Sequence, residues 1–537
     1  MDGRLFTVAG VALGLSLLGL VNPYKDSAAR WDQNDLGEFG SVSESPDQWR
    51  GSSLGMTITG WAPGRFEVET VRPGLAAATA GVYPGDQLIK VGDIDLLTQG
   101  RKQLTDYLKT LPPNTKIPVK VSRTIGPSLV EGSQENGGSR QRKKQLNLML
   151  STDSEAMLDG WLVAEHLQAN PVIHHSLKLR GELKRLETLK TQILHGVKKS
   201  KSPRIAYERI NRWIDQLGVS HAAILPAWGY ARLTQRASGG IGLILKRLVF
   251  GGRLRYFVVD LQAGGPAGVS ELKIGDEVVE VNGVPLDKSA RLVLAGEEHR
   301  QQLFTVTSAA FESLTLTCRK TASGGLVRIQ LKTDSKLSAV SASRSSLCVI
   351  PIATKRVGYY RVWNLMSMEM DRILRTAMDY QFKDCAGLII DLRGRGGVIP
   401  VAQRMEQTIL DCGLPVIVIV DRHSRSAKEI LAIRLKGSPA VKLVGQTTSG
   451  SVAAASFAKL PSGNALMFPV TSGKDLSRFT RDVDLEGRGV TPDVCIDFDL
   501  PYLQGRDPLL EAAKKQLRGV LTQTKAEKNV KSAKMGG

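Results

Sequence analysis

The sequence predicts an α+β multidomain protein, and three observations lead to this fold class. The 537 residues exceed what one hydrophobic core usually organises. Three short runs rich in Ile and Val, at residues 388–392, 415–420 and 441–444, are separated by helix-compatible segments, which is typical of buried parallel strands with crossover helices. An order of short strands, a helix and more strands also occurs twice earlier in the chain. We therefore expect a parallel α/β core preceded by smaller mixed units.

Charge and cysteine content limit the function classes. The net charge is +20, from 72 basic and 52 acidic side chains, and aromatic residues make up 5%. Without a nucleic-acid-binding motif, this charge favours weak attraction to an anionic membrane or cell-envelope surface over a specific nucleic-acid partner. The five cysteines show neither a CxxC pair nor ligand spacing, so we interpret them as small core residues. No metal, disulfide framework or cofactor is expected.

An apolar run at residues 6–21 predicts export across a membrane. Arg4 precedes the run and Lys25 follows it. The run is long for the core of a signal peptide but shorter than the roughly 20 residues of a spanning helix, so a signal peptide and an uncleaved anchor both stay open. A buried N-terminal helix is the third alternative. Export would make the protein extracytoplasmic, either periplasmic or secreted, and residues 6–21 would anchor it if they are not cleaved.

The two mixed units share a motif order. The first has LGMT from Leu54, PGLAAA from Pro73 and VYPGDQLIKV from Val82. The second has GIGL from Gly240, then GGPA at 264–267 and LKIGDEVVEVNG at 272–283. Both units resemble PDZ domains, which implies that backbone N–H groups of a loop bind a peptide's C-terminal carboxylate. A small mixed domain without a ligand stays open for each unit. The implied loop residues are Leu54, Gly55 and Met56 in the first unit and Gly240, Ile241, Gly242 and Leu243 in the second.

A helical segment separates the two mixed units. Residues 155–228 are helical in pattern, and five apolar residues recur at three- and four-residue steps, which predicts an amphipathic helix. A helix at 206–217 should end at Gly218, and it is followed by Ser220 and His221. A histidine just beyond a helix end is more often structural than catalytic. The five apolar residues are Leu179, Leu183, Leu186, Leu189 and Ile193.

Two turns in the predicted core carry a candidate for chemistry. A glycine-rich turn at 394–397 follows one predicted strand, and a small polar turn at 424–427 follows the next and leads into a helix at Glu429. Sites in parallel sheets lie beyond the carboxyl ends of the strands. Ser426 is therefore our candidate nucleophile, with backbone N–H groups of the glycine turn as partners for a carbonyl oxygen. We also expect a strand at 357–362, a helix at 367–382 and paired strands at 457–460 and 465–468.

From residue 153 to 517 the chain resembles the tail-specific, C-terminal-processing serine peptidases, a family related to the crotonase-like fold. The motifs that carry the resemblance are GLIIDLRGRGG at Gly387, SAKEI at Ser426, LVGQTTSGS at Leu443 and GRGVTPDV at Gly487. The resemblance implies a serine endopeptidase that acts through an acyl-enzyme on Ser426. It also implies an oxyanion hole formed by the N–H groups of Ala427 and of Gly396 or Gly397.

The common branch of this family pairs its serine with a lysine, but here Ser451 stands at the lysine position. A serine hydroxyl cannot serve as a base at neutral pH. The tricorn branch is similar to this chain in a Ser-His pair and a late glutamate, which implies His221 as general base with Ser220 and Glu486 orienting it. His423 is a less favoured base. Lys428, Lys436 and Lys442 are disfavoured because an inward lysine on an exposed helix is not expected.

These observations give the following organisation. We expect a serine endopeptidase that recognises substrates through its PDZ units. The alternatives are an inactive PDZ scaffold that binds C-terminal tails or the cell envelope, and a crotonase-like acyl-CoA enzyme. The boundaries are 1–25, signal peptide or anchor; 26–50, linker; 51–152, first PDZ-like unit; 153–235, helical segment; 236–334, second PDZ-like unit; 335–520, peptidase core; and 521–537, disordered basic tail. A further disordered loop is expected at 126–144.

Overall fold

The computed structural model describes residues 52–535 apart from positions 61, 126–141, 228–229, 231–239, 296–302, 309–310, 334–336 and 473. The predicted signal or anchor and the linker after it lie outside the described residues, as does most of the predicted loop at 126–144. The last residues of that loop, 142–144, belong to a strand. Among the described residues, no helix is both long and apolar enough to cross a membrane.

A six-stranded sheet forms the centre of the core. Its order is β18-β19-β20-β21-β22-β25; β18 pairs antiparallel with β19, and all later pairs are parallel. The three apolar runs form β20, β21 and β22, which confirms the predicted parallel strands. The bounds are β18 Cys348–Ile352, β19 Lys355–Arg361, β20 Leu388–Asp391, β21 Val416–Val420, β22 Val441–Gly445 and β25 Val494–Cys495.

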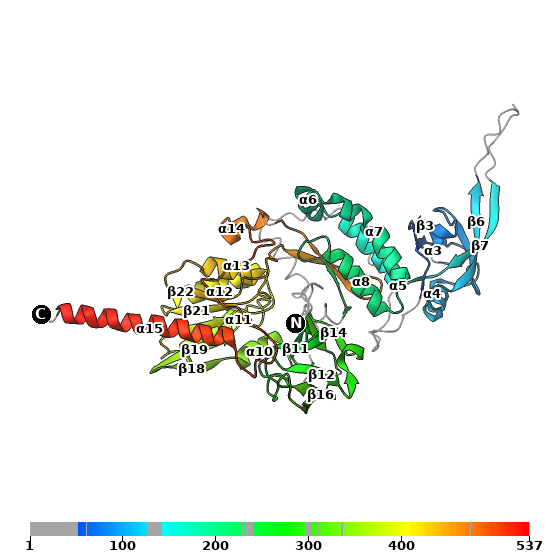
Figure 1. Cartoon of the computed structure of the whole chain (residues 1–537). Coiled ribbons are helices and arrows are strands. Elements are labelled where there is room, and N and C mark those ends of the chain that lie inside the picture. Colours follow the sequence, from blue (N-terminus) through cyan, green and yellow to red (C-terminus); the bar gives the residue numbers. More distant parts are fainter. Residues whose placement is uncertain are drawn as a thin grey trace, which may run out of the picture.

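Helices cover both faces of this sheet (Figure 1). One face packs against α11 (Glu369–Asp379), α12 (Ile399–Asp411) and α13 (Ala427–Leu435). The other face packs against α15 (Pro508–Met535). Burial on both faces explains why these strands are continuous apolar runs rather than alternating ones. The core also contains α10 (Ala339–Ser345), α14 (Ser477–Thr480) and a 3₁₀ turn at Lys474–Leu476.

The prediction of a disordered tail at 521–537 is wrong, because α15 continues as one helix to Met535. High charge and few apolar residues are typical of disordered segments, which is why disorder was predicted. Its Lys, Ala, Glu and Gln residues are strong helix formers, and the helix is already nucleated where α15 packs against the sheet.

The first mixed unit is a six-stranded sheet in the order β2-β3-β4-β6-β7, with β5 paired to β4. The second is an eight-stranded sheet that contains the same path, β10-β11-β12-β16-β17, with β13 paired to β12 and β14-β15 added beside β10. The first unit comprises β2 Met56–Thr59, β3 Glu67–Val71, α3 Ala76–Thr79, β4 Gln87–Val91, β5 Ile94–Asp95, α4 Arg101–Thr110, β6 Lys116–Ile125 and β7 Arg142–Ser151. The second comprises β10 Leu243–Phe250, β11 Arg253–Leu261, β12 Glu277–Val281, β13 Val284–Pro285, a 3₁₀ turn Leu286–Lys288, β14 Leu292–Leu294, β15 Leu303–Val306, β16 Ser313–Arg319 and β17 Leu326–Lys332.

The two mixed units also repeat individual contacts. In each loop a glycine at positive φ precedes the first strand, Gly55 at 69° and Gly242 at 71°. The residue before each glycine accepts a backbone hydrogen bond, from Ala77 to Leu54 at 3.0 Å and from Ala267 to Ile241 at 2.8 Å. The aspartate of each Gly-Asp turn is also paired, Asp86 with Arg123 and Asp276 with Lys320. The recurrence seen in the sequence is therefore a structural repeat.

Four helices and a small sheet join the first unit to the core. The helices are α5 Glu155–Gln168, α6 Pro171–Leu179, α7 Leu183–Lys198 and α8 Pro203–Asp215. They pack against the sheet β23-β24-β9, whose strands are Ala455–Lys459, Ala465–Pro469 and Ala223–Leu225. The pairing of β23 with β24 was predicted. A two-stranded ladder, β1 Ser52–Ser53 with β8 Asp153–Ser154, lies beside the first unit.

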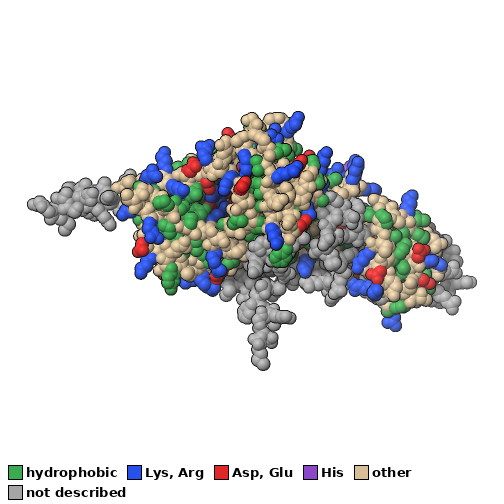
Figure 2. All heavy atoms as spheres, turned by 90° about the horizontal axis from the view of Figure 1, so that it is seen from below, with side chains coloured by type: hydrophobic (Ala, Val, Ile, Leu, Met, Phe, Trp, Pro, Cys, Tyr) green, Lys and Arg blue, Asp and Glu red, His purple; other side chains and the backbone are tan. Residues whose placement is uncertain are grey.

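The predicted apolar stripe is interrupted by a turn. Leu186, Leu189 and Ile193 of α7 are buried, but Leu179 is 72% exposed because α6 ends there and Gly181 (φ 71°) turns the chain. Basic side chains are spread over the visible face of the molecule rather than gathered into one patch (Figure 2). An even basic coat agrees with a solvated surface.

Candidate active site

Ser426 stands on a strained turn between β21 and α13. Its backbone angles are φ 54° and ψ −127°, a region that residues with a Cβ rarely adopt. The N–H group of Ser426 is fixed in this conformation because it donates to Ser451 O at 2.8 Å and to Glu429 Oε2 at 3.1 Å. A serine on a sharp strand-to-helix turn of this kind projects its hydroxyl at the end of the sheet.

The glycine turn after β20 lies directly against Ser426. A Cβ on Gly396 would come within 2.7 Å of Ser426 Cβ and 2.9 Å of Arg425 O, so only glycine fits there. Among the described residues, the N–H groups of Gly396, Gly397 and Ala427 donate no hydrogen bond. The predicted oxyanion donors are therefore close to the serine and available to a ligand.

Glu429 holds the loop that follows β22 onto the serine turn. Its carboxylate is fully buried and accepts from Thr448 Oγ1 at 2.6 Å, Gly450 N at 2.7 Å and Ser451 N at 2.8 Å, besides Ser426 N. Burial raises the pKa of Glu429 to about 7, although the four hydrogen bonds oppose the shift. The glutamate of the SAKEI motif is thus a positioning group for the turn.

Ser451, at the position where the common branch has lysine, is fully buried. Its N–H group donates to Glu429, its carbonyl accepts from Ser426, and its hydroxyl lies 2.8 Å from Ser449 Oγ. The position is therefore adjacent to Ser426 in space, but it supplies backbone support and no basic group.

His221 and Ser220 lie just before β9. Ser220 Oγ is 2.9 Å from His221 Nδ1, both side chains are buried, and His221 has a φ of 57°. Because β9 pairs with β24, and β24 with β23, this segment joins the sheet that begins four residues after Ser451. Within the described part of the chain no hydrogen bond links the His221 ring to Ser426 Oγ. Such bonds are often long before substrate binds.

Glu486 is placed on the loop after Ser451 rather than on the histidine. Its Oε2 accepts from Val452 N at 3.0 Å and Ala453 N at 3.1 Å. Among the described residues it makes no hydrogen bond or ion pair with His221. The structure therefore brings Ser426, Gly396, Gly397 and Ala427 together, and it brings Ser220 and His221 together.

The expectation that Lys428 points outward is wrong. Lys428 is fully buried, and its Nζ donates to Arg393 O at 2.9 Å and Trp363 O at 3.3 Å. Burial lowers its pKa to about 7. The expectation failed because nearly every residue of α13 is buried between the sheet and its neighbouring helices, so this helix has no exposed face to receive the lysine.

The other rejected bases have no described hydrogen bond to the serine hydroxyl. Lys436 donates to Thr491 O and Lys442 to Gln516 of α15. His423 has a ring Nδ1 that is buried without a hydrogen-bond partner in the described structure, and burial lowers its pKa. None of the three forms a hydrogen bond with Ser426 among the described residues.

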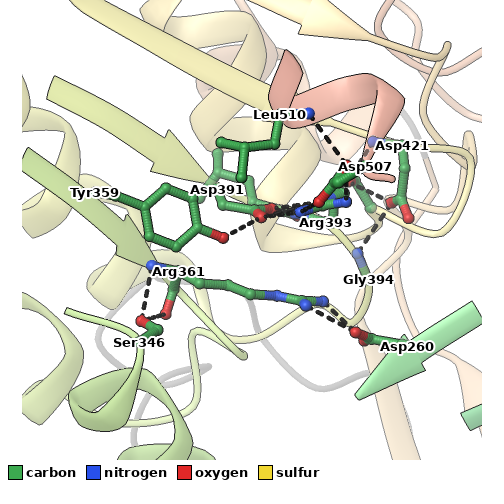
Figure 3. A network of polar contacts seen from close by, with 12 residues as sticks. Asp260, Ser346, Tyr359, Arg361, Asp391, Arg393, Gly394, Asp421, Asp507 and Leu510 are labelled. Atoms are coloured by element: carbon green, nitrogen blue, oxygen red, sulfur yellow. Dashed lines mark hydrogen bonds and ion pairs between the residues drawn. The ribbon is translucent and has the colours of Figure 1, made fainter. Parts of the chain in front are cut away.

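A charged network beneath the glycine turn was missed by sequence reasoning (Figure 3). Arg393 binds Asp391 and Asp507, so the turn is tied to the start of α15. Arg361 of β19 binds both oxygens of Asp260 of β11 at 2.7 Å, which joins the eight-stranded sheet to the core. The arginines of the DLRGRGG motif gave a signal, but Asp507, which binds Arg393, and Asp260, which binds Arg361, are each more than 100 residues away from their partners in sequence. Further contacts are Tyr359 Oη to Asp391 and Gly394 N to Asp421 Oδ1.

Among the described residues, no group of three or more His, Cys, Asp or Glu side chains is arranged to hold a metal ion. Cys318 and Cys385 are buried as expected of core residues, whereas Cys348 and Cys495 are exposed. The interpretation of the cysteines as core residues therefore fits the first two and is wrong for the exposed pair, which lie on edge strands of the core sheet.

A serine on a strained strand-to-helix turn, with unoccupied N–H groups beside it at the end of a parallel sheet, defines the class of serine-type hydrolases. Residues 400–496, which contain Ser426, Glu429, Ser451 and Glu486, match the family model "Peptidase family S41". This part of the chain is therefore similar to the S41 serine peptidases, and the names of the curated relatives point to the C-terminal-processing peptidases among them.

Two curated relatives carry the corresponding name. Carboxyl-terminal-processing peptidase 1, chloroplastic, from Arabidopsis thaliana is 24% identical over 332 residues, which cover 57% of this chain and 65% of the relative. C-terminal processing peptidase, chloroplastic, from Tetradesmus obliquus is 24% identical over 326 residues, covering 54% and 68%. The chain thus spans about two thirds of the length of the curated relatives it matches.

Similar solved structures were also found. The photosystem II D1 C-terminal processing protease has 20% identity and a TM-score of 0.40, with 68% of this chain and 97% of that chain covered. The tricorn protease has 16% identity and a TM-score of 0.33, with 76% and 40% covered. Both TM-scores are below 0.5, so no conclusion is drawn from these two structures.

Proposed function

We propose that this protein is a serine endopeptidase that cleaves peptide or protein substrates through an acyl-enzyme on Ser426. The observation that carries the proposal is the strained backbone of Ser426, held against Gly396 with three unoccupied N–H groups nearby. Strain of this kind persists where the surrounding structure enforces it, and it is concentrated at functional sites. The N–H groups of Ala427 and of Gly396 or Gly397 would stabilise the negative charge that develops on the carbonyl oxygen.

His221 is the proposed general base. It would take the proton from Ser426 Oγ as that oxygen attacks the scissile carbonyl, and it would return the proton to the leaving amine. Ser220 is 2.9 Å from His221 Nδ1 and would fix the ring orientation. Because Glu486 already binds two N–H groups of the loop after Ser451, we propose that it acts on the histidine through that loop and its charge rather than through a direct bond.

Substrate recognition is proposed to use the two repeated units as PDZ-like peptide-binding domains. The loops at Leu54–Met56 and Gly240–Leu243 have matching glycine conformations and backbone contacts. Such loops bind a C-terminal carboxylate through backbone N–H groups while the peptide adds as a strand. The relatives named chloroplastic processing peptidases and the apolar run at 6–21 agree with an extracytoplasmic or lumenal site of action.

Labelling with a fluorophosphonate probe tests the nucleophile directly. The full chain should be labelled at Ser426 and should hydrolyse a generic protein substrate such as casein, whereas Ser426→Ala should do neither. Ser438→Ala, in the loop after α13, is the matched control and should retain both. Absence of labelling in the unaltered chain would sink the proposal and favour the inactive PDZ scaffold.

The identity of the base needs a separate experiment. A histidine base predicts that kcat/KM rises with pH between about 6 and 7. Lys428, whose pKa is lowered to about 7, would give nearly the same profile, so pH alone does not discriminate. His221→Ala should reduce kcat/KM by about 10³-fold or more, and added imidazole should restore part of it. Full activity in His221→Ala would exclude the histidine.

A further inference from the structure

Arg395 is a half-buried arginine for which the described residues supply no partner, and it lies one residue from the proposed oxyanion donors. Among the described residues its guanidinium makes no hydrogen bond and no ion pair, and burial lowers its pKa. An arginine that is partly removed from water without a paired carboxylate is costly for the folded protein. Residues that break this rule are concentrated at functional sites.

The backbone on both sides of Arg395 is fixed. Gly394 N donates to Asp421 Oδ1 at 2.9 Å, and Gly396 O accepts from Leu365 N at 2.9 Å. Gly396 itself lies against Ser426. The backbone that carries Arg395 is therefore held next to the serine, and a rigid support of this kind suits a substrate-binding group.

The nearest carboxylate does not neutralise Arg395. Asp260 of β11 attracts it, but both oxygens of Asp260 are already bound to Arg361 at 2.7 Å, as Figure 3 shows. The same region contains more cations. Arg422 contributes to the lowered pKa of Lys246 of β10, and both cations lower the pKa of His423, so these side chains lie near one another.

We propose that Arg395 forms a carboxylate-binding subsite beside Ser426 and gives the peptidase a preference for substrates with a carboxylate close to the scissile bond. A guanidinium binds a carboxylate through two parallel hydrogen bonds, and a partly buried site strengthens them. The carboxylate could belong to an Asp or Glu side chain or to the free C-terminus of the substrate. The proposal names a substrate class for the function proposed above and rests on that function.

Matched peptide pairs test the subsite with the full chain. Quenched fluorescent peptides that differ only by Asp or Asn at each position around the cleaved bond should differ in kcat/KM by about ten- to a hundred-fold at one position, the range expected of a hydrogen bond to a charged group. Peptides ending in a free carboxylate or in an amide separate the second source from the first. A ratio near one at every position, for both pairs, would overturn the proposal.

Variants assign the preference to Arg395. Arg395→Gln should bring the Asp/Asn ratio close to one, Arg395→Lys should retain part of it, and Arg395→Glu should make Lys-containing peptides better than Asp-containing ones. Arg372→Gln, on the exposed surface of α11, is the matched control and should leave the ratio unchanged. An unchanged ratio in Arg395→Gln would exclude Arg395 as the binding group.

Binding to Ser426→Ala provides a readout that does not require turnover. Calorimetry should show tighter binding of the preferred Asp peptide than of its Asn partner by a similar factor, and Arg395→Gln in the same background should remove the difference. Equal binding would overturn the subsite. If the protein is labelled and hydrolyses casein but shows no preference for Asp over Asn peptides, the proposed peptidase function stands and only the subsite is rejected.

Discussion

At the residue scale, the conformation of Ser426 depends most directly on Glu429. In Glu429→Gln the side-chain nitrogen would replace one carboxylate oxygen and face donors, so two of the four hydrogen bonds would be lost. Each buried N–H group left without an acceptor costs about 1–3 kcal/mol. We expect a lower urea midpoint and a large loss of fluorophosphonate labelling. Glu187→Gln, exposed on α7, is the control, and equal labelling of the two variants would contradict this role.

Lys428 makes stability depend on pH in a defined direction. Its pKa is about 7 in the folded protein, lowered first by burial and next by Arg361, against 10.5 for an unperturbed lysine. Between these values the unfolded chain binds more protons than the folded one, so this contribution to stability rises with pH and is lost as pH falls towards 7. Carboxylates that face the group, Asp391, Asp421 and Asp260, oppose the shift.

Lys428→Met should therefore flatten the rise of the urea midpoint between pH 7 and 9. From about pH 8 upward this window lies above the raised pKa of Glu429, so that group adds little to the slope there. Lys436→Met, at the other end of α13, is the matched control. If the urea midpoints of Lys428→Met and the unaltered protein differ by the same amount at pH 7 and at pH 9, the buried ammonium does not cause the pH dependence of stability.

Residue patterns located the turn that carries the candidate nucleophile, Ser426, but not the environment of its neighbours. Ser426 was predictable because its motif follows a buried strand and precedes a helix. The burial of Lys428 was not predictable, because a lysine on a helix normally faces solvent. The sequence does not show that α12, α14 and the sheet enclose α13. The partner of Arg361 was hidden for a similar reason, since Asp260 lies in another sheet.

At the scale of elements, the glycine turn after β20 allows a close comparison of two substitutions. Gly394 has a φ of 69° and open space around a Cβ, so Gly394→Ala should cost about 1–2 kcal/mol from backbone strain alone. Gly396→Ala would drive a methyl group against Ser426 Cβ and Arg425 O. We expect Gly396→Ala to abolish labelling of Ser426 and Gly394→Ala mainly to lower thermal stability. Gly325→Ala places its methyl group in open space, so it is the control and should show neither effect. Full labelling of Gly396→Ala would contradict the packing described here.

Elements were predictable where local chemistry decides them. The parallel strands were found because burial on both faces leaves a continuous apolar run, and the end of α8 because a glycine follows it. The break between α6 and α7 was missed because the apolar spacing continues across it while Gly181 turns the chain. The helical C-terminal segment was missed because its charge was weighed above its helix propensity.

At the scale of the whole molecule, contacts between segments far apart in sequence set the arrangement. Asn170 donates to Pro469 O, and Asp159 binds Ser462, so the helical segment is fixed to the sheet that follows the Ser451 loop. The structural repeat and the order of the units were visible in the sequence. The sequence does not show which faces of the units contact each other, because each of these contacts joins residues about 300 positions apart and no local pattern pairs them.

The ion pair between Arg361 and Asp260 should couple the eight-stranded sheet to the core. Both side chains are mostly buried, with 11% and 18% exposure, and removing one partner of such a pair leaves an uncompensated charge that costs about 3–5 kcal/mol if burial is complete. Arg361→Met and Asp260→Asn should each speed hydrogen exchange in β11 and β19, and the double variant should add less than the sum of the two. Arg344→Met, whose pair with Glu369 is exposed, is the matched control. Strictly additive effects would mean that the two sheets are held together by other contacts, such as the hydrogen bond from Tyr502 to Glu277.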